Sequence, residues 1–169
     1  MLTAVSFLLP LLPLTLAAPA PAGTASFKPF QISELTSFSP SGRPGSSPYS
    51  TLNLTVTDVN RNGKATTKCS TQFLPSEQPP QGDTACADPS FVFRATDYQS
   101  TGQFKLVLSH TYPLKPEGRI TTEGAVTVDN TAKHPNYYCS YAASGFVSCG
   151  IAEGKAPLKA PITSVSAVA

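Results

Sequence analysis

The sequence predicts an all-β fold, a single compact antiparallel β-barrel or sandwich with two intrachain disulfides. Short stretches of alternating apolar and polar residues recur along the chain, and no stretch has a convincing helical period. Turn-forming residues separate these stretches, including 17 prolines and 11 glycines. Residues 136–150 place Cys139 and Cys149 on either side of a small-residue turn at Gly145, which is typical of a disulfide-bonded hairpin.

The N-terminal residues differ from the rest of the chain. Residues 7–17 form an apolar run with the length of a signal-peptide core, although no Lys or Arg precedes it. We therefore expect a signal peptide over residues 1–17 and a secreted, extracellular protein. A transmembrane span is not expected, because the run is short and contains Pro10 and Pro13. Residues 18–26, rich in Ala and Pro, are expected to be a disordered leader.

The remaining chain has the length of one domain, about 150 residues. We place a β-barrel or sandwich domain at residues 27–151 and a C-terminal tail at residues 152–169, which forms a last edge strand or frays. The 12 Lys and Arg and 10 Asp and Glu residues are spread without runs of like charge. No phosphate-binding track is present, so a nucleic acid is not an expected partner. No second apolar run of spanning length is present either, so a membrane is not expected as a partner.

The clearest expected strand is residues 49–59, in which Leu52 and Leu54 alternate with Asn53 and Thr55. An Asn-Gly turn at residues 62–63 leads into its partner strand. In chain order, the expected strands are residues 27–38, 49–59, 64–73, 91–95, 103–112 and 120–128, followed by the hairpin. Proline-rich loops are expected at 39–48 and 74–89, and turns at 98–102 and 113–118.

The four cysteines are Cys69, Cys86, Cys139 and Cys149. An even number of cysteines behind a signal peptide implies disulfides, and four cysteines allow three pairings. Sequential pairing is favoured, because each bond then closes a local loop. The spacing is not the Cys-x-x-Cys of a structural zinc site, so no metal is expected.

Asn53-Leu54-Thr55 is a sequon for N-glycosylation. The alternation of the strand places Asn53 on the face opposite Leu52 and Leu54, toward solvent. Asn53 is therefore a candidate glycosylation site, and the alternative is an unmodified surface asparagine.

No reaction is indicated by the remaining polar residues. A Ser–His–Asp hydrolase can be drawn from His110, Asp97 and one of many serines, but the Gly-x-Ser-x-Gly motif is absent. A metal site built on histidine would need His110 and His134 together, and nothing in their spacing requires this. No pattern selects a glycosidase pair from the available acids, Asp58, Asp97, Glu117 and Glu123. We expect no catalytic residue, no cofactor and no enzyme activity.

Three tyrosines, Tyr137, Tyr138 and Tyr141, form the densest aromatic group and are possible partner-binding residues. In a strand, Tyr137 and Tyr141 share a face with Cys139, and Tyr138 lies on the other face. One set is expected to pack near the disulfide, and the other is the candidate contact surface. The absence of tryptophan counts against a typical sugar-stacking module.

Four motifs, taken in order, resemble the family of fungal secreted proteins typified by the Alternaria major allergen. They are FQISELTSF at 30–38, the Ser/Pro/Gly loop leading to YSTLNLTVT at 49–57, Cys69 with a polar loop to Cys86 and an FVF strand, and NYYCSYAASGFVSCG at 136–150. The resemblance implies an antiparallel β-barrel or sandwich with two sequential disulfides. It also implies a role in fungus–plant interaction, as an effector or elicitor of plant defence, with some relatives allergenic.

The typical allergen carries an additional N-terminal cysteine that links a dimer. This chain has no fifth cysteine, so we expect a monomer or a non-covalent dimer. The leading hypothesis is a non-enzymatic protein that binds a host protein or a cell-wall component through its surface. The alternatives are a barrel that holds a lipid or phenolic ligand in an apolar cavity, and a small secreted hydrolase. A filled core with shallow grooves favours the first, a large apolar pocket the second, and a polar cleft with a His beside a carboxylate the third.

Overall fold

The computed structural model describes residues 27–60, 63–114, 117–130, 136–152 and 154–168. These residues form antiparallel strands in two sheets and no helix. Sheet A contains, in spatial order, β3 (Ala65–Phe73), β2 (Ser50–Asp58), β1 (Phe30–Ser39), β9 (Val147–Ile151) and β8 (Tyr137–Tyr141), and β10 (Leu158–Ala160) also pairs with β1. Sheet B contains β11 (Ile162–Val168), β7 (Arg119–Asp129), β6 (Gln103–Pro113), β5 (Phe91–Ser100) and β4 (Thr84–Ala85).

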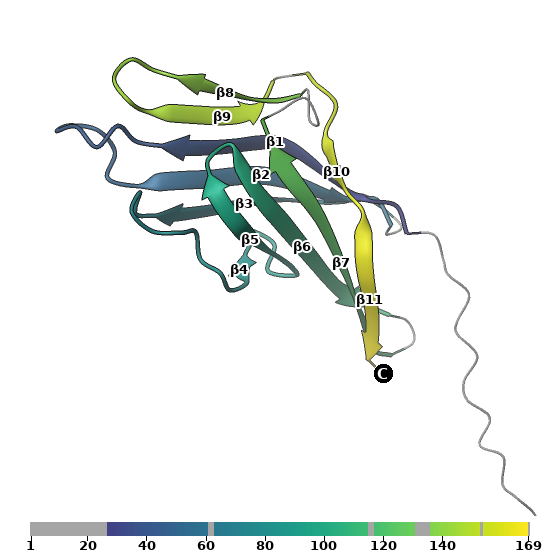
Figure 1. Cartoon of the computed structure of the whole chain (residues 1–169). Coiled ribbons are helices and arrows are strands. Elements are labelled where there is room, and N and C mark those ends of the chain that lie inside the picture. The colour runs from purple at the N-terminus through teal and green to yellow at the C-terminus, as the bar shows by residue number, and fades with distance from the viewer. Residues whose placement is uncertain (1–26, 61–62, 115–116, 131–135, 153, 169) are drawn as a thin grey trace, which may run out of the picture.

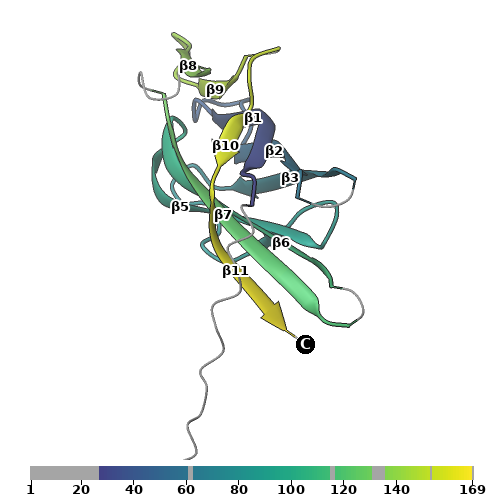
Figure 2. The same cartoon turned by 90° about the vertical axis from the view of Figure 1, so that its right-hand side faces the viewer.

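The two sheets pack face to face, with the strands of sheet B running obliquely across those of sheet A (Figure 1). The view turned by 90° shows β10 and β11 passing from one sheet to the other along one side (Figure 2). The all-β prediction is confirmed. Of its two forms, the sandwich fits, because within the described ranges the sheets do not close into a barrel.

The core lies between the sheets and is filled by alternate residues of their strands. The period-two pattern of the sequence is confirmed here, because Leu52 and Leu54 in β2 and Leu106 and Leu108 in β6 are buried. The largest fully buried side chains are Tyr137, Phe30, Phe91, Phe93, Phe104, Ile32, Leu35, Leu52, Leu106, Leu108, His110 and Val56.

Strand β1 contains a bulge that changes which of its residues face the core. The register with β2 shifts between Ser33 and Thr36, and Glu34 has a φ of 52°. Because of this extra residue, Ile32 and Leu35 both point inward although they are an odd number of positions apart. The bulge also divides the outer edge of β1, since its first half pairs with β10 and its second half with β9.

Gly124 lies within β7 at the point where the chain crosses between the sheets. A Cβ atom there would lie 2.9 Å from the Phe30 ring and 2.9 Å from the Pro161 carbonyl oxygen. The backbone N–H of Ala125 donates to that carbonyl at 3.1 Å. A residue without a side chain is therefore needed at Gly124 for the close approach of the crossover.

The tail and two loops hold more strand than the sequence pattern indicates. Strand β10 buries Leu158 and Ala160 against the core, and β11 is the edge strand of sheet B. The packed part of the chain thus continues beyond Ile151. The loop expected at 74–89 contains the short strand β4, and β5 continues to Ser100 through a register shift, which shortens the expected turn at 98–102.

Two disulfides, Cys69–Cys86 and Cys139–Cys149, confirm the sequential pairing. The first joins β3 of sheet A to the residue that follows β4 of sheet B, and the second links the paired strands β8 and β9. Both fit an oxidising, extracellular environment. Among the described residues, no helix is long and apolar enough to cross a membrane.

Candidate functional site

The outer face of sheet A is covered by neutral hydrogen-bonding side chains. Inward-facing residues of β2 and β3 are apolar or buried, and the residues between them point out to solvent. We call the outward set the hydroxyl face. Its polar members are Gln31, Thr36, Thr51, Asn53, Thr55, Thr57, Thr66, Ser70, Gln72, Ser140 and Ser148, and its aromatic members are Phe38 and Tyr138.

The pairing register arranges the hydroxyl face in rows that cross five strands. One row contains Tyr138, Gly150, Thr36, Asn53 and Ser70. The next row contains Ser140, Ser148, Phe38, Thr51 and Gln72. Each residue lies opposite the next across a strand pair, so the face is a regular lattice of side chains.

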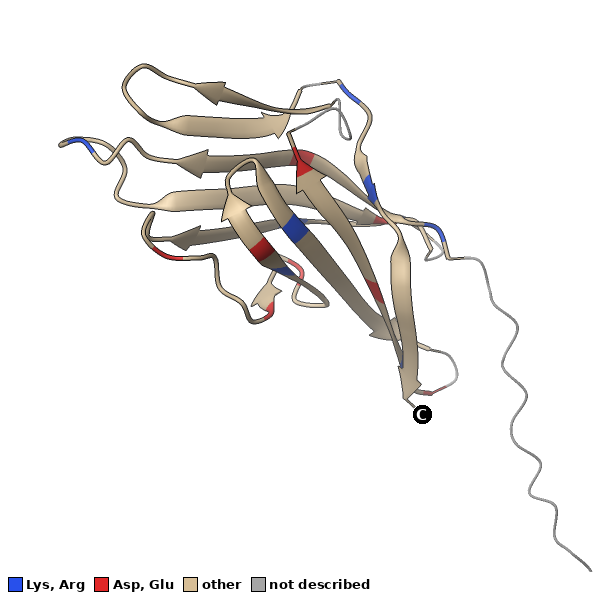
Figure 3. Cartoon of the chain, in the orientation of Figure 1, with Lys and Arg blue, Asp and Glu red and all other residues tan. Residues whose placement is uncertain are grey.

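Charge is sparse on the hydroxyl face and lies toward its margins. Lys68 projects from the edge strand β3, Lys159 of β10 lies opposite Gln31, and Glu34 lies at the β1 bulge. The Thr55 hydroxyl donates to a Glu34 carboxylate oxygen at 2.7 Å, and the hydroxyls of Thr57 and Thr66 are hydrogen-bonded at 2.9 Å. In Figure 3 β8 and β9 are free of charged residues, whereas β5, β6 and β7 carry them.

A hollow of about 400 Å³ opens at one margin of the hydroxyl face. It lies where the edge of β1 passes from β10 to β9, so the bulge at Glu34 creates it. Its lining residues are Ser33, Glu34, Thr36, Ile151, Ala152, Gly154 and Lys155. The hollow is open to solvent and forms a concave site next to the otherwise flat hydroxyl face.

Of the three tyrosines predicted from the sequence, two are exposed and one is buried. Tyr137 is 1% exposed, and its hydroxyl donates to the Thr101 carbonyl at 2.7 Å. Burial raises the pKa of Tyr137 far above its ordinary value. The ring and the hydroxyl of Tyr137 are thus both engaged in the core, and of the three predicted partner-binding tyrosines it is the one without an exposed side chain.

Tyr138 and Tyr141 lie on the two faces of the edge strand β8. Tyr138 is 54% exposed and belongs to the hydroxyl face. Tyr141 is 70% exposed on the other face, where its hydroxyl accepts a hydrogen bond from Asn130 at 3.3 Å. The two rings thus face different surroundings although they share a strand.

Asn53, the candidate glycosylation site, is exposed in the middle of the hydroxyl face. It lies between Thr36 of β1 and Ser70 of β3 in the same row. A glycan on Asn53 would stand over the centre of the lattice. Glycosylation of Asn53 would therefore restrict access to the hydroxyl face.

His110 pairs with Asp58 rather than with Asp97. The His110 Nδ1 lies 2.8 Å from the Asp58 carboxylate, and both side chains are fully buried. The Phe91 ring stacks on the imidazole at 3.7 Å. Within the described part of the chain, the His110 Nε2 has no hydrogen-bond partner.

Burial alone would raise the pKa of Asp58, but hydrogen bonds from His110 and from the backbone and side chain of Asn60 outweigh it, and the pKa is lowered. Since an ionised carboxylate only accepts hydrogen bonds, the His110 Nδ1 carries the donated proton. The pair links β2 of sheet A to β6 of sheet B. With no solvent exposure it cannot meet a substrate, so its role is to join the sheets.

Of the other polar candidates, His134 lies outside the described residues. Among the residues that the structure describes, no group of three or more His, Cys, Asp or Glu side chains is placed to hold a metal ion.

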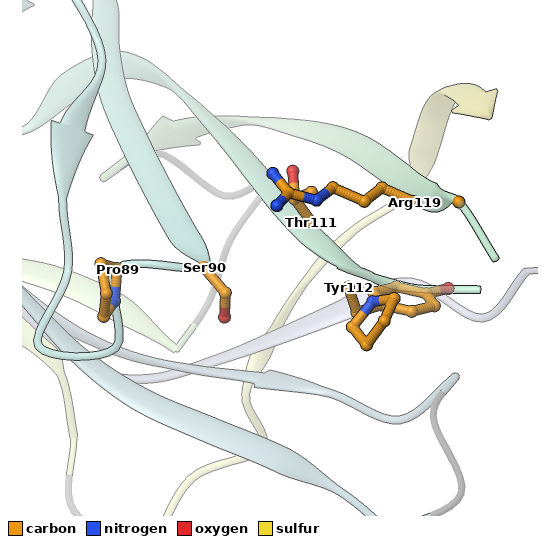
Figure 4. Close-up of a pocket in the computed structure, with 7 residues that line it drawn as sticks. Pro89, Ser90, Thr111, Tyr112 and Arg119 are labelled. Atoms are coloured by element: carbon orange, nitrogen blue, oxygen red, sulfur yellow. The ribbon is translucent and has the colours of Figure 1, made fainter. Parts of the chain in front are cut away.

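An open groove of about 580 Å³ lies beside the start of β5 and the end of β6. Figure 4 shows Pro89 and Ser90 on one side of it and Thr111, Tyr112 and Arg119 on the other. Arg119 has no ion pair within the described residues. The groove is shallow and its polar groups do not converge on one point, so it supports no specific reaction.

The hydroxyl face and the His110–Asp58 pair were both missed in the sequence. The alternation of Asn53, Thr55 and Thr57 was the available signal for the face, but the neighbours that complete each row come from distant strands. No sequence signal relates Asp58 to His110.

The comparisons with known proteins show no family for this chain. No family model, no curated protein and no solved structure matches it. The resemblance to the Alternaria allergen family therefore stays a prediction from sequence motifs.

Proposed function

We propose that this protein is a secreted, non-enzymatic, effector- or elicitor-like protein that binds a host or cell-wall component through its surface. The apolar N-terminal run and the two disulfides support secretion. The motif resemblance supports a fungal origin and a plant host.

One observation carries this proposal: the interior of the sandwich is filled, and the hollows of the described residues open to solvent. Phe30, Phe93 and Phe104 are among the side chains that occupy the space between the sheets. The described hollows open to solvent, including one of about 260 Å³ at the rim of the sandwich that the buried Ser50 and Phe73 help to line, so a ligand meets this protein at its outside.

The same observation weighs against the two alternatives. A lipid or phenolic ligand requires an apolar cavity, and large apolar side chains occupy the interior here. A hydrolase built on His110 requires access to its imidazole, which is fully buried beside Asp58.

The test is a pull-down with the mature protein from residue 18, its disulfides intact. The immobilised protein is exposed to plant apoplastic fluid and to isolated plant and fungal walls, and reduced protein is the control. We expect retention of one defined component that is lost on reduction, because the surface depends on the stapled fold. Retention of nothing would overturn the proposal, and specific uptake of a small lipid or phenol would then favour the ligand-binding alternative.

A further inference from the structure

We infer that the hydroxyl face binds a neutral polysaccharide, an extended polymer of uncharged sugar units. This inference rests on the proposed function, because it names the face and the partner class for surface binding. It is carried by the chemistry of the face, by its regularity and by its two aromatic rings.

The polar groups of the face match those of a sugar. Hydroxyl and amide side chains both donate and accept hydrogen bonds, as sugar hydroxyls do. A nucleic acid or an anionic polymer requires clustered Lys or Arg residues, but the basic residues of this lattice, Lys68 on β3 and Lys159 on β10, lie on strands at opposite sides of β1 and β2 and form no cluster. The fitting ligand is therefore uncharged and rich in hydroxyl groups.

The regular lattice fits a repeating ligand. Neighbouring strands lie about 4.8 Å apart, so a row across five strands spans about 19 Å. A polymer presents its hydroxyls at regular intervals and meets such a row several times. The core of a protein–protein interface is enriched in aromatic residues, Met and Arg and depleted in Ser, so the serines and the lack of Arg and Met, though not the two aromatic rings, set this surface apart from one.

Two aromatic rings add an apolar platform. Tyr138 ends one row, and Phe38 lies in the middle of the next, where it contacts Phe146 at a centroid distance of 6.0 Å. The flat apolar face of a sugar ring packs on such side chains, and the tyrosine hydroxyl keeps a polar contact. In this chain tyrosine and phenylalanine supply the stacking for which other surfaces use tryptophan.

Asn53 lies at the centre of the lattice, so the binding form has this residue unmodified. The test therefore uses mature protein made without glycans and with both disulfides formed. It is incubated with suspensions of cellulose, chitin and β-1,3-glucan, and the bound fraction is measured over a range of polymer concentrations. Apoplastic protein is tested in parallel.

Two matched pairs of variants locate the binding face. Tyr138→Ala should weaken polymer binding about threefold to tenfold, whereas Tyr141→Ala, on the other face of the same strand, should leave it unchanged. Asn53→Glu should weaken binding about tenfold or more, because an unpaired charge would be covered by the polymer. Thr127→Glu is its control, since Thr127 is exposed on sheet B opposite Lys105. Thermal unfolding of each variant checks that the fold is intact.

The possible failures are distinguishable. If the protein binds none of the polymers but retains an apoplastic protein, the inference is overturned and the proposed function stands. If polymer is bound equally by Asn53→Glu and Thr127→Glu, the face is wrong and the inference is also overturned. If neither polymer nor protein is retained, the inference and the proposed function fail together.

Discussion

The outer faces of the two sheets differ in the way their side chains are stabilised. On sheet B, Arg94 lies between two carboxylates, 2.6 Å from Asp83 and 2.9 Å from Glu123. These hydrogen bonds raise the pKa of Arg94. On sheet A, hydroxyls supply the contacts, as between Thr57 and Thr66 and from Thr55 to the Glu34 carboxylate. Among the described residues, the ion pairs of the outer faces thus lie on sheet B, whereas the sheet A face is held mainly by hydroxyl hydrogen bonds.

This difference distinguishes a sheet surface suited to solvation from one suited to binding a ligand. Mixed charges favour solvation and keep a surface free of partners. Hydroxyls paired only weakly can exchange their hydrogen bonds for those of a ligand at small cost. If the sheet A face is the binding face, changes there should alter binding more than stability, and changes on sheet B should do the reverse.

The largest effect is expected at the contact that both faces depend on, the buried Asp58–His110 pair. Asp58→Ala leaves His110 buried without its acceptor, and we expect a loss of about 3–5 kcal/mol in the free energy of unfolding. Urea denaturation measures it. Asp83→Ala, an exposed carboxylate of sheet B, is the control, and its loss should be about 1 kcal/mol or less. Equal losses would mean that the pair does not hold the sheets together.

Acid should weaken the same contact. The pKa of Asp58 is held below its ordinary value of 3.8, so the folded state binds this proton less readily than the unfolded state. The stability that the pair contributes is therefore fully present above about pH 4 and is lost as the pH falls through the lowered pKa. Unfolding of the native protein and of Asp58→Asn should be compared from pH 7 to pH 2. A stability difference that stayed constant below pH 4 would contradict this assignment.

The hairpin disulfide should matter to both stability and binding. The double change Cys139→Ala with Cys149→Ala avoids a free thiol, and we expect a loss of about 3 kcal/mol on the chain-entropy account. Binding to polysaccharide should fall as well, because β8 carries Tyr138. The matched double change Cys69→Ala with Cys86→Ala should lower the free energy of unfolding by a similar amount. At temperatures below unfolding it should leave polysaccharide binding unchanged. Equal binding losses would remove the distinction between the two ends of sheet A.

The sequence predicted the strands well and their partners poorly, and the reason is physical. Alternation in residues 49–59 is a local property, so it reveals β2 and its exposed residues without knowledge of the fold. The rows of the hydroxyl face depend on pairing across the sheet, and the bulge at Glu34 shifts which residues of β1 face outward. Tyr137 has the same local setting as its neighbours and is distinguished only by Phe104 and the Thr101 carbonyl beneath it.

The ion pairs of sheet B should contribute modestly to stability and not to binding. Arg94→Met removes both pairs while keeping an apolar stem, and we expect a loss of about 1 kcal/mol. The loss should shrink at high salt, where exposed charges are screened. Thermal unfolding at low and high salt measures both the stability loss and its salt dependence. Polysaccharide binding that fell with this variant would place the ligand on sheet B instead.

The smallest effects come from two hydroxyl pairs that are nearly equivalent in geometry. Thr57 and Thr66 are 2.9 Å apart on sheet A, and Thr111 and Thr121 are 2.8 Å apart on sheet B. Thr57→Val and Thr111→Val should each change the free energy of unfolding by about 1 kcal/mol or less, because each removes one cross-strand hydrogen bond. Their effects on polysaccharide binding should differ, with a measurable loss only for Thr57→Val. Since the two changes are the same in chemistry and similar in stability, a difference in binding can come only from the face on which each residue lies, and its absence would show that the two faces are equivalent to the ligand.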